Sequence, residues 1–138
     1  MKNKKVLVIG GSGFLGSNLS ELLIEKKYKV TIFDKKKINL NGKYQFLKGD
    51  IKNFKRLSSA IKNKDYIYFF AGMGDITECL NNPVMTIKQN ILSVLNIMEL
   101  ASRFKIKRFI FASTIYIHSS QGSYYRVSKH SAELYIDE

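Results

Sequence analysis

The chain has 138 residues, of which 45% are hydrophobic, so it contains enough apolar material for the core of one domain. Its formal net charge is +12, and 19 of its 23 basic residues are lysines spread along the chain. Arginines are few and no known nucleic-acid motif accompanies the lysines, so nucleic-acid binding is the less favoured interpretation. The charge would instead attract polyanionic ligands.

Other features bear on the cellular compartment. Cys79 is the only cysteine, which excludes an intrachain disulfide and suits a reducing compartment. The apolar part of the N-terminus ends after four residues at Gly10, unlike a secretory signal. No apolar run approaches the ~20 residues of a membrane span. We therefore expect a cytoplasmic protein that has no membrane partner.

The spacing of apolar residues predicts strands alternating with helices. We expect strands at 5–9, 29–33, 44–47, 66–70 and 108–112, and helices at 13–27, 54–61, 83–104 and 125–136. This order predicts an α/β fold, a doubly wound parallel sheet of the Rossmann type with strand order 3-2-1-4-5. No repeat, low-complexity tract or linker divides the chain, so residues 1–138 are expected to form one domain.

Three spaced glycines, Gly10, Gly13 and Gly16, follow the first predicted strand and open the first predicted helix. The first glycine allows a tight turn, the second lets the backbone approach a pyrophosphate, and the third lets the helix pack close to the strand. Asp34 lies 18 residues beyond Gly16, at the end of the second predicted strand, where a carboxylate can accept hydrogen bonds from an adenosine ribose. A glycine turn that binds nothing, with Asp34 capping it, is the alternative. The combination favours a dinucleotide-binding domain.

A second group of residues predicts catalysis. Thr114 follows the fifth predicted strand, and Tyr125 and Lys129 lie four residues apart on one face of the last predicted helix. A nearby ammonium favours the phenolate, which makes tyrosine usable as an acid or base. Ligands of open α/β sheets bind at the strand ends where Thr114 lies. A solvated helix face is the alternative explanation for the tyrosine and lysine.

Together these motifs resemble the extended short-chain dehydrogenase/reductases, the NAD-dependent epimerase/dehydratase family, which acts mainly on nucleotide sugars. The resemblance covers essentially the whole chain. It implies that NAD is bound by Gly10, Gly13, Phe14, Leu15, Gly16, Asp34, Asp50, Ile51, Ala71, Gly72, Tyr125 and Lys129. Within that set, the pair at 50–51 would contact adenine and the pair at 71–72 would pass beneath the pyrophosphate and the nicotinamide ribose. Asn90 resembles an asparagine of mostly structural role. No metal is implied.

The resemblance also implies a reaction. Tyr125 would take the proton from a sugar hydroxyl while hydride moves to nicotinamide, Lys129 would favour the phenolate and bind the nicotinamide ribose, and Thr114 would orient the hydroxyl. Dehydratases of the family carry Asp-Glu directly after the catalytic hydroxyl, where this chain has Ile115 and Tyr116. The expected activity is therefore that of a nucleotide-sugar epimerase or reductase. Only 11 residues separate Thr114 from Tyr125, a shorter loop than in most members.

The sequence ends at Glu138, where the resemblance leads us to expect further strands and a C-terminal substrate domain. We expect the cofactor-binding part of a longer architecture, poorly active alone, whether a truncated chain, a gene fragment or a standalone cofactor domain. The alternative is a catalytically silent dinucleotide-binding module that acts through protein interactions. The helix predicted at 83–104 is apolar around much of its circumference, and we expect it to form a homodimer interface with the helix at 125–136.

Overall fold

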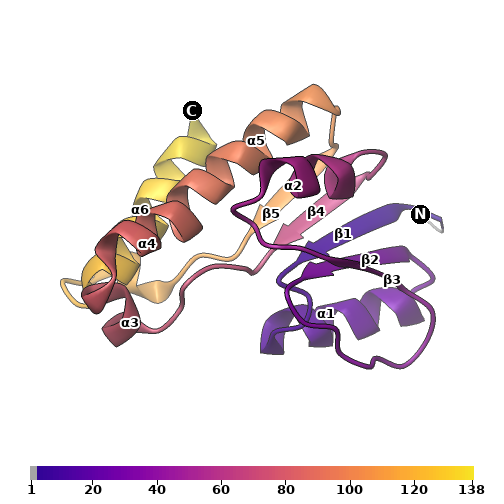
Figure 1. Cartoon of the computed structure of the whole chain (residues 1–138), viewed down its shortest axis with the longest axis horizontal. Coiled ribbons are helices and arrows are strands. Elements are labelled where there is room, and N and C mark those ends of the chain that lie inside the picture. The colour runs from indigo at the N-terminus through magenta and orange to yellow at the C-terminus, as the bar shows by residue number, and fades with distance from the viewer. Residues whose placement is uncertain (1–2) are drawn as a thin grey trace.

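A five-stranded parallel sheet with helices on both faces forms the centre of the computed structural model, which describes residues 3–138 (Figure 1). The strands are β1 (Lys5–Ile9), β2 (Lys29–Asp34), β3 (Gln45–Lys48), β4 (Tyr66–Phe69) and β5 (Arg108–Phe111). Their order in the sheet is β3-β2-β1-β4-β5, and every neighbouring pair is parallel. The predicted doubly wound α/β architecture and strand order are confirmed.

Helix α1 (Phe14–Glu25) covers one face of the sheet (Figure 1). Successive residues of a strand point to opposite faces, so a strand covered on both sides is apolar throughout. Val6, Val8 and Ile32 point to the α1 face and are fully buried there, in a cluster that also holds Leu23 of α1.

Helices α2 (Phe54–Ile61) and α5 (Ser93–Arg103) cover the other face. Leu7 and Phe33 point to this face and form the larger core cluster with Leu57 of α2 and Ile97 of α5. Helix α6 (Ser123–Asp137) packs beside α5 and places Ala132 in the same cluster. Residues of β1 and β2 therefore contribute to the cores on both faces of the sheet.

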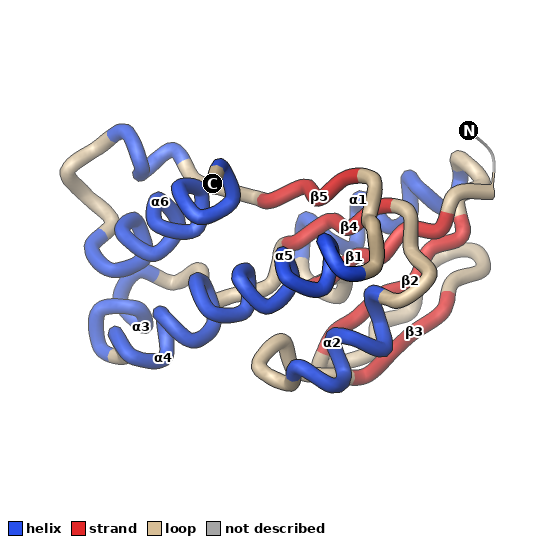
Figure 2. Tube along the Cα trace, turned by 90° about the horizontal axis from the view of Figure 1, so that it is seen from above, coloured by secondary structure: helices blue, strands red, loops and turns tan. Residues whose placement is uncertain are grey.

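The first half of α6, with the short helices α3 (Ile76–Asn81) and α4 (Pro83–Ile87), lies beyond the carboxyl ends of the strands (Figure 2). These three helices contact one another. They form a projecting layer at the edge of the sheet where ligands of open α/β folds bind. Within residues 3–138, no helix has the length and hydropathy needed to cross a membrane.

The helix predicted over 83–104 is present and runs without a break from Pro83 to Arg103, but the prediction did not include a π turn within it. The segment comprises α4, a π-helical turn at Lys88–Leu92 and α5. A π turn accommodates an extra residue and is rare. Here the side chain of Asn90 points inward from the π turn and is almost fully buried. It forms hydrogen bonds with two other segments of the chain. Apolar periodicity does not reveal such a turn, because the residues on either side still follow a helical pattern.

Short elements were also missed. Helix α3 and a 3₁₀ turn at Ile115–His118 were not predicted, and α6 begins at residue 123 rather than 125. The other predicted elements are present, with ends that differ by at most two residues.

Candidate active site

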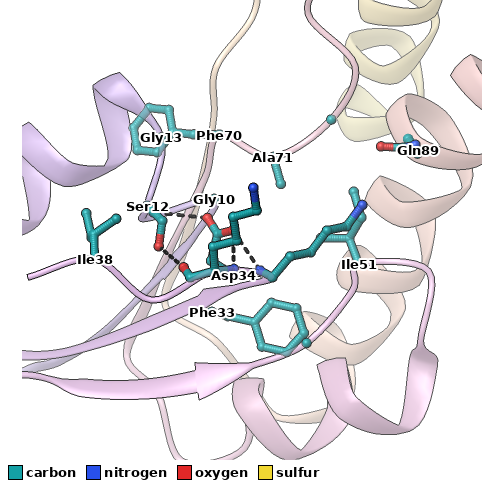
Figure 3. A pocket seen from close by; sticks show the side chains of 14 residues that line it. Gly10, Ser12, Gly13, Phe33, Asp34, Ile38, Ile51, Phe70, Ala71 and Gln89 are labelled. Atoms are coloured by element: carbon teal, nitrogen blue, oxygen red, sulfur yellow. Dashed lines mark hydrogen bonds between the residues drawn. The ribbon is translucent and has the colours of Figure 1, made fainter.

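A cleft of about 450 Å³ opens at the carboxyl edge of β1, β2 and β4 (Figure 3). It is lined by Gly10, Ser12, Gly13, Phe33, Asp34, Lys35, Lys36, Ile38, Gly49, Ile51, Phe70, Ala71, Gly72 and Gln89. Six of the residues predicted to bind the cofactor are in this set: Gly10, Gly13, Asp34, Ile51, Ala71 and Gly72. Residues from five separate segments of the chain therefore meet around one cleft.

The three glycines of the turn differ in whether the fold itself requires glycine at that position. Gly10 has a φ of +79°, and a Cβ there would lie 2.6 Å from the backbone nitrogen of Ala71. A Cβ on Gly16 would lie 2.2 Å from the carbonyl oxygen of Gly10. Gly13 has an ordinary φ of −79°, and a Cβ there would meet nothing closer than 3.4 Å. The fold thus requires Gly10 and Gly16, whereas the space beside Gly13 is open to the cleft and suits close approach of a pyrophosphate.

Asp34 lies in the middle of the cleft and fixes the glycine turn (Figure 3). Its Oδ2 accepts a hydrogen bond from the backbone N–H of Ser12 at 3.0 Å, and its Oδ1 accepts from the backbone N–H of Lys35 at 2.7 Å. The Ser12 hydroxyl donates to the carbonyl of Lys36 at 2.6 Å. A carboxylate has about four lone-pair directions, so Asp34 keeps acceptor capacity for ribose hydroxyls.

Asp50 stands behind this cleft rather than lining it. Its Oδ2 lies 3.4 Å from Nζ of Lys35 and 3.7 Å from Nζ of Lys52. Partial burial raises the pKa of Asp50, but the backbone N–H of Lys52 and the two ammonium groups outweigh it, so the pKa falls below its ordinary value. The next residue, Ile51, is 5% exposed and lines the cleft.

A buried hydrogen-bond network ties the projecting helices to the cleft wall. Asn90 Oδ1 accepts from the backbone N–H of Met73 at 2.8 Å, and its Nδ2 donates to the Met73 carbonyl at 3.0 Å and to Ser128 Oγ at 3.0 Å. Ser128 Oγ donates to the carbonyl of Tyr125 at 2.8 Å. Gly72, which lines the cleft, has no room for a Cβ because Asn90 Oδ1 would lie 2.5 Å away. The network therefore fixes the start of α6 relative to the segment that follows β4.

Thr114 and Tyr125 are brought to the same region by a tight loop. Thr114 precedes the 3₁₀ turn, and its Oγ1 accepts from the backbone N–H of Tyr116 at 3.4 Å. The Tyr116 and Tyr125 rings pack edge to face, with centroids 6.3 Å apart. Gly122, with a φ of +95°, allows the return because a Cβ there would crowd Tyr116 at 3.1 Å.

Lys129 is the most deeply buried charged side chain of the described residues, at 9% exposure. Its Nζ lies 4.1 Å from the centroid of the Phe111 ring, at the end of β5. Burial lowers the pKa of Lys129 to about 8, against an opposing effect of Glu133. The lysine makes no ion pair within residues 3–138. Lys129 lies one helical turn after Tyr125 on α6.

Several predicted residues do not line the cleft. Thr114, Tyr125 and Lys129 lie outside its walls, and Gly16 acts by helix packing. The side chains of Phe14 and Leu15 are 83% and 58% exposed. Their role in cofactor binding, like that of the other site residues, stays a prediction.

Sequence reasoning did not identify every residue of the cleft. The lining also includes Ser12, Phe33, Lys35, Lys36, Ile38, Gly49, Phe70 and Gln89. Most of these are neighbours of predicted residues, so their positions at the ends of the predicted strands could have identified them. Gln89 was not accessible to this reasoning, since it reaches the cleft from the unpredicted π turn.

Comparisons with known proteins identify the family and several relatives of this chain. The model of the NAD dependent epimerase/dehydratase family matches residues 6–137. A putative UDP-glucose 4-epimerase of Methanocaldococcus jannaschii is 35% identical over 115 residues, covering 79% of this chain and 37% of the relative. The UDP-glucose 4-epimerase of Rhizobium meliloti is 31% identical over 123 residues, covering 83% and 36% respectively.

A solved structure of a UDP-N-acetylglucosamine 4-epimerase from Methanobrevibacter ruminantium M1, in complex with UDP-N-acetylmuramic acid, is also similar. It is 27% identical, with a TM-score of 0.88, over 99% of this chain and 50% of that one. The chain thus spans between about a third and a half of the length of these relatives.

Proposed function

Because the chain belongs to the NAD dependent epimerase/dehydratase family, we propose that residues 1–138 are the NAD-binding domain of a nucleotide-sugar epimerase or reductase. The main support for the proposal is the cleft at the carboxyl edge of the sheet. Gly13 and Asp34 both line it, and the space beside Gly13 is open. The 4-epimerases of UDP-sugars among the relatives support a nucleotide sugar as substrate.

The cleft residues would hold NAD by backbone and carboxylate groups. The turn ending at Gly13 leads into α1, whose first turn contains no acidic side chain that would oppose the positive helix end. The pyrophosphate would lie there, and Asp34 would accept hydrogen bonds from the adenosine ribose. When bound, NAD supplies the group that accepts hydride from the sugar and returns it. The family is NAD-dependent, in agreement with the predicted cofactor.

Tyr125 would move the proton of the reacting sugar hydroxyl, and Lys129 and Thr114 would support it. The Lys129 ammonium, held over Phe111, stabilises the phenolate of Tyr125 and is available to the nicotinamide ribose. Thr114, at the end of β5, would hydrogen-bond the same sugar hydroxyl. The hydrogen bonds of Asn90 would hold these groups in a fixed position relative to the cleft wall.

We expect residues 1–138 alone to bind NAD but to turn over little or no nucleotide sugar. The epimerases from Methanocaldococcus jannaschii and Rhizobium meliloti are more than twice as long, and part of the substrate site would lie outside this segment. Positioning of substrate contributes ~7–11 kcal/mol to lowering a barrier, which Tyr125 and Lys129 cannot replace. The test compares UDP-glucose turnover by residues 1–138 with that of the product of the complete gene. Robust epimerisation by the short chain would contradict the proposal.

We also expect a two-fold dimer that buries the exposed apolar side chains of α4, the π turn and α6. These include Val84 at 64%, Ile87 at 49%, Leu92 at 47%, Val127 at 46%, Leu134 at 58% and Tyr135 at 55% exposure. Sedimentation of the complete protein should show a dimer, which Val84→Glu combined with Val127→Glu should dissociate. A monomer at high concentration would contradict this interface.

A further inference from the structure

A second groove, of about 960 Å³, lies at the opposite edge of the sheet, where β1 and β2 begin and α1 and α2 end. The strands run from this edge towards the cofactor cleft, so the sheet separates the two sites (Figure 1). Six of its 16 lining residues are lysines: Lys5, Lys27, Lys29, Lys43, Lys62 and Lys64. Among the described residues, no aspartate, glutamate or arginine lines it.

Strand register pairs two of these lysines, and a hydrogen bond links a third to the same sheet edge. Lys5 of β1 and Lys29 of β2 are direct partners in the parallel ladder, so their side chains start from the same face. Like charges at such paired positions are destabilising. Lys64, just before β4, is half-buried, and its Nζ donates to Thr31 Oγ1 at 2.7 Å. Burial and the nearby charge of Lys5 lower the pKa of Lys64.

The adjacent acidic residue does not neutralise this charge. Asp65 follows Lys64, but its Oδ1 accepts from Nζ of Lys107 at 2.7 Å. Its Oδ2 accepts from the backbone N–H of Lys5 at 2.9 Å rather than from an ammonium of the groove. An anion of several charges would offset the repulsion among the lysines.

We propose that this amino-edge groove binds an oligophosphate anion, held by the ammonium groups of Lys5, Lys29 and Lys64. The volume of about 960 Å³ is that of a small-molecule site, and all three of these lysines line it. A nucleic acid would instead need donors spread along an extended track, together with the arginines that this groove lacks.

The test is calorimetric titration of residues 1–138 with inorganic triphosphate at about 150 mM salt, where charge pairs between exposed groups are screened. We expect saturable binding of one triphosphate per chain. Lys29→Gln with Lys64→Gln should weaken it at least tenfold. A second variant, Lys5→Gln with Lys29→Gln, changes only exposed side chains and should also weaken binding at least tenfold. It serves as the test if the half-buried Lys64 proves necessary for folding. Circular dichroism verifies the fold of each variant.

The matched control removes two exposed lysines that line neither groove, Lys55→Gln with Lys88→Gln, and should leave the affinity within about twofold. Equal weakening by the control, absence of saturable binding, or binding of a single-stranded oligonucleotide in preference to triphosphate would overturn the proposal. Displacement of triphosphate by NAD would also overturn it, because that would place the anion in the cofactor cleft.

Discussion

Tyr125→Phe is expected to lower nucleotide-sugar turnover by the complete protein by roughly 10³-fold, while NAD affinity changes by less than about twofold. The substitution removes only the phenolic oxygen. The ring can still pack edge to face with Tyr116, and the hydrogen bond from the Ser128 hydroxyl to the Tyr125 carbonyl is unaffected. The loss should therefore fall on the catalytic step rather than on folding or cofactor binding. Turnover and NAD affinity would be measured on the same preparation.

The neighbouring Tyr124 provides a matched control, because it is 47% exposed and lies in the same helical turn. Tyr124→Phe should retain turnover within about twofold. If Tyr125→Phe were as active as the control, the acid–base assignment would be wrong. If neither wild type nor variant turned over any nucleotide sugar yet both bound NAD, the silent binding module would be favoured.

Lys129→Met is expected to stabilise the fold at neutral pH by ~1–3 kcal/mol and to abolish turnover. Burial costs the charged lysine free energy, as its pKa of about 8 indicates, whereas methionine fills a similar volume beside Phe111 without that cost. Such a gain in stability with loss of function is typical of a site residue held under strain.

The pH dependence of this stability difference follows from the lowered pKa of Lys129. In the folded state Lys129 loses its proton as the pH rises through about 8, whereas in the unfolded chain it keeps the proton up to its ordinary value of 10.5. The unfolded state then binds more protons, so wild-type stability from this group rises between these two values. The advantage of Lys129→Met should shrink over the same range. Urea unfolding at pH 7 and pH 10 would measure it, with the exposed Lys55→Met as control, and a variant less stable than wild type at pH 7 would contradict it.

Much of the fold could be predicted because its central strands β1 and β2 are buried on both sides. β1 and β4 are continuous apolar runs, and the glycine turn and Asp34 mark the strand ends on either side of α1. The π turn escaped prediction because it depends on the contacts of Asn90 with Met73 and Ser128, residues 17 and 38 positions away. Tertiary hydrogen bonds of this kind leave no periodic signal in the sequence.

The site could be predicted where local geometry dictates the residue. Gly10 needs a positive φ and Gly16 a close approach, and both requirements follow from a strand–turn–helix pattern. The pairing of Asp50 with Lys35, by contrast, depends on how the ends of β2 and β3 meet, which spacing along the chain does not specify. The burial of Lys129 likewise depends on Phe111, which comes from another element.

The central claim, an NAD site at the carboxyl edge built around Gly13 and Asp34, is tested most directly by titrating residues 1–138 with NAD and NADP. We expect saturable NAD binding that is tighter than NADP binding, because the Asp34 carboxylate would repel a 2′-phosphate, although Lys35 and Lys36 line the same cleft. Gly13→Ala should weaken NAD binding at least tenfold with little change in thermal stability, since only the ligand needs that space. Tighter binding of NADP, or NAD affinity unchanged by Gly13→Ala, would contradict the account.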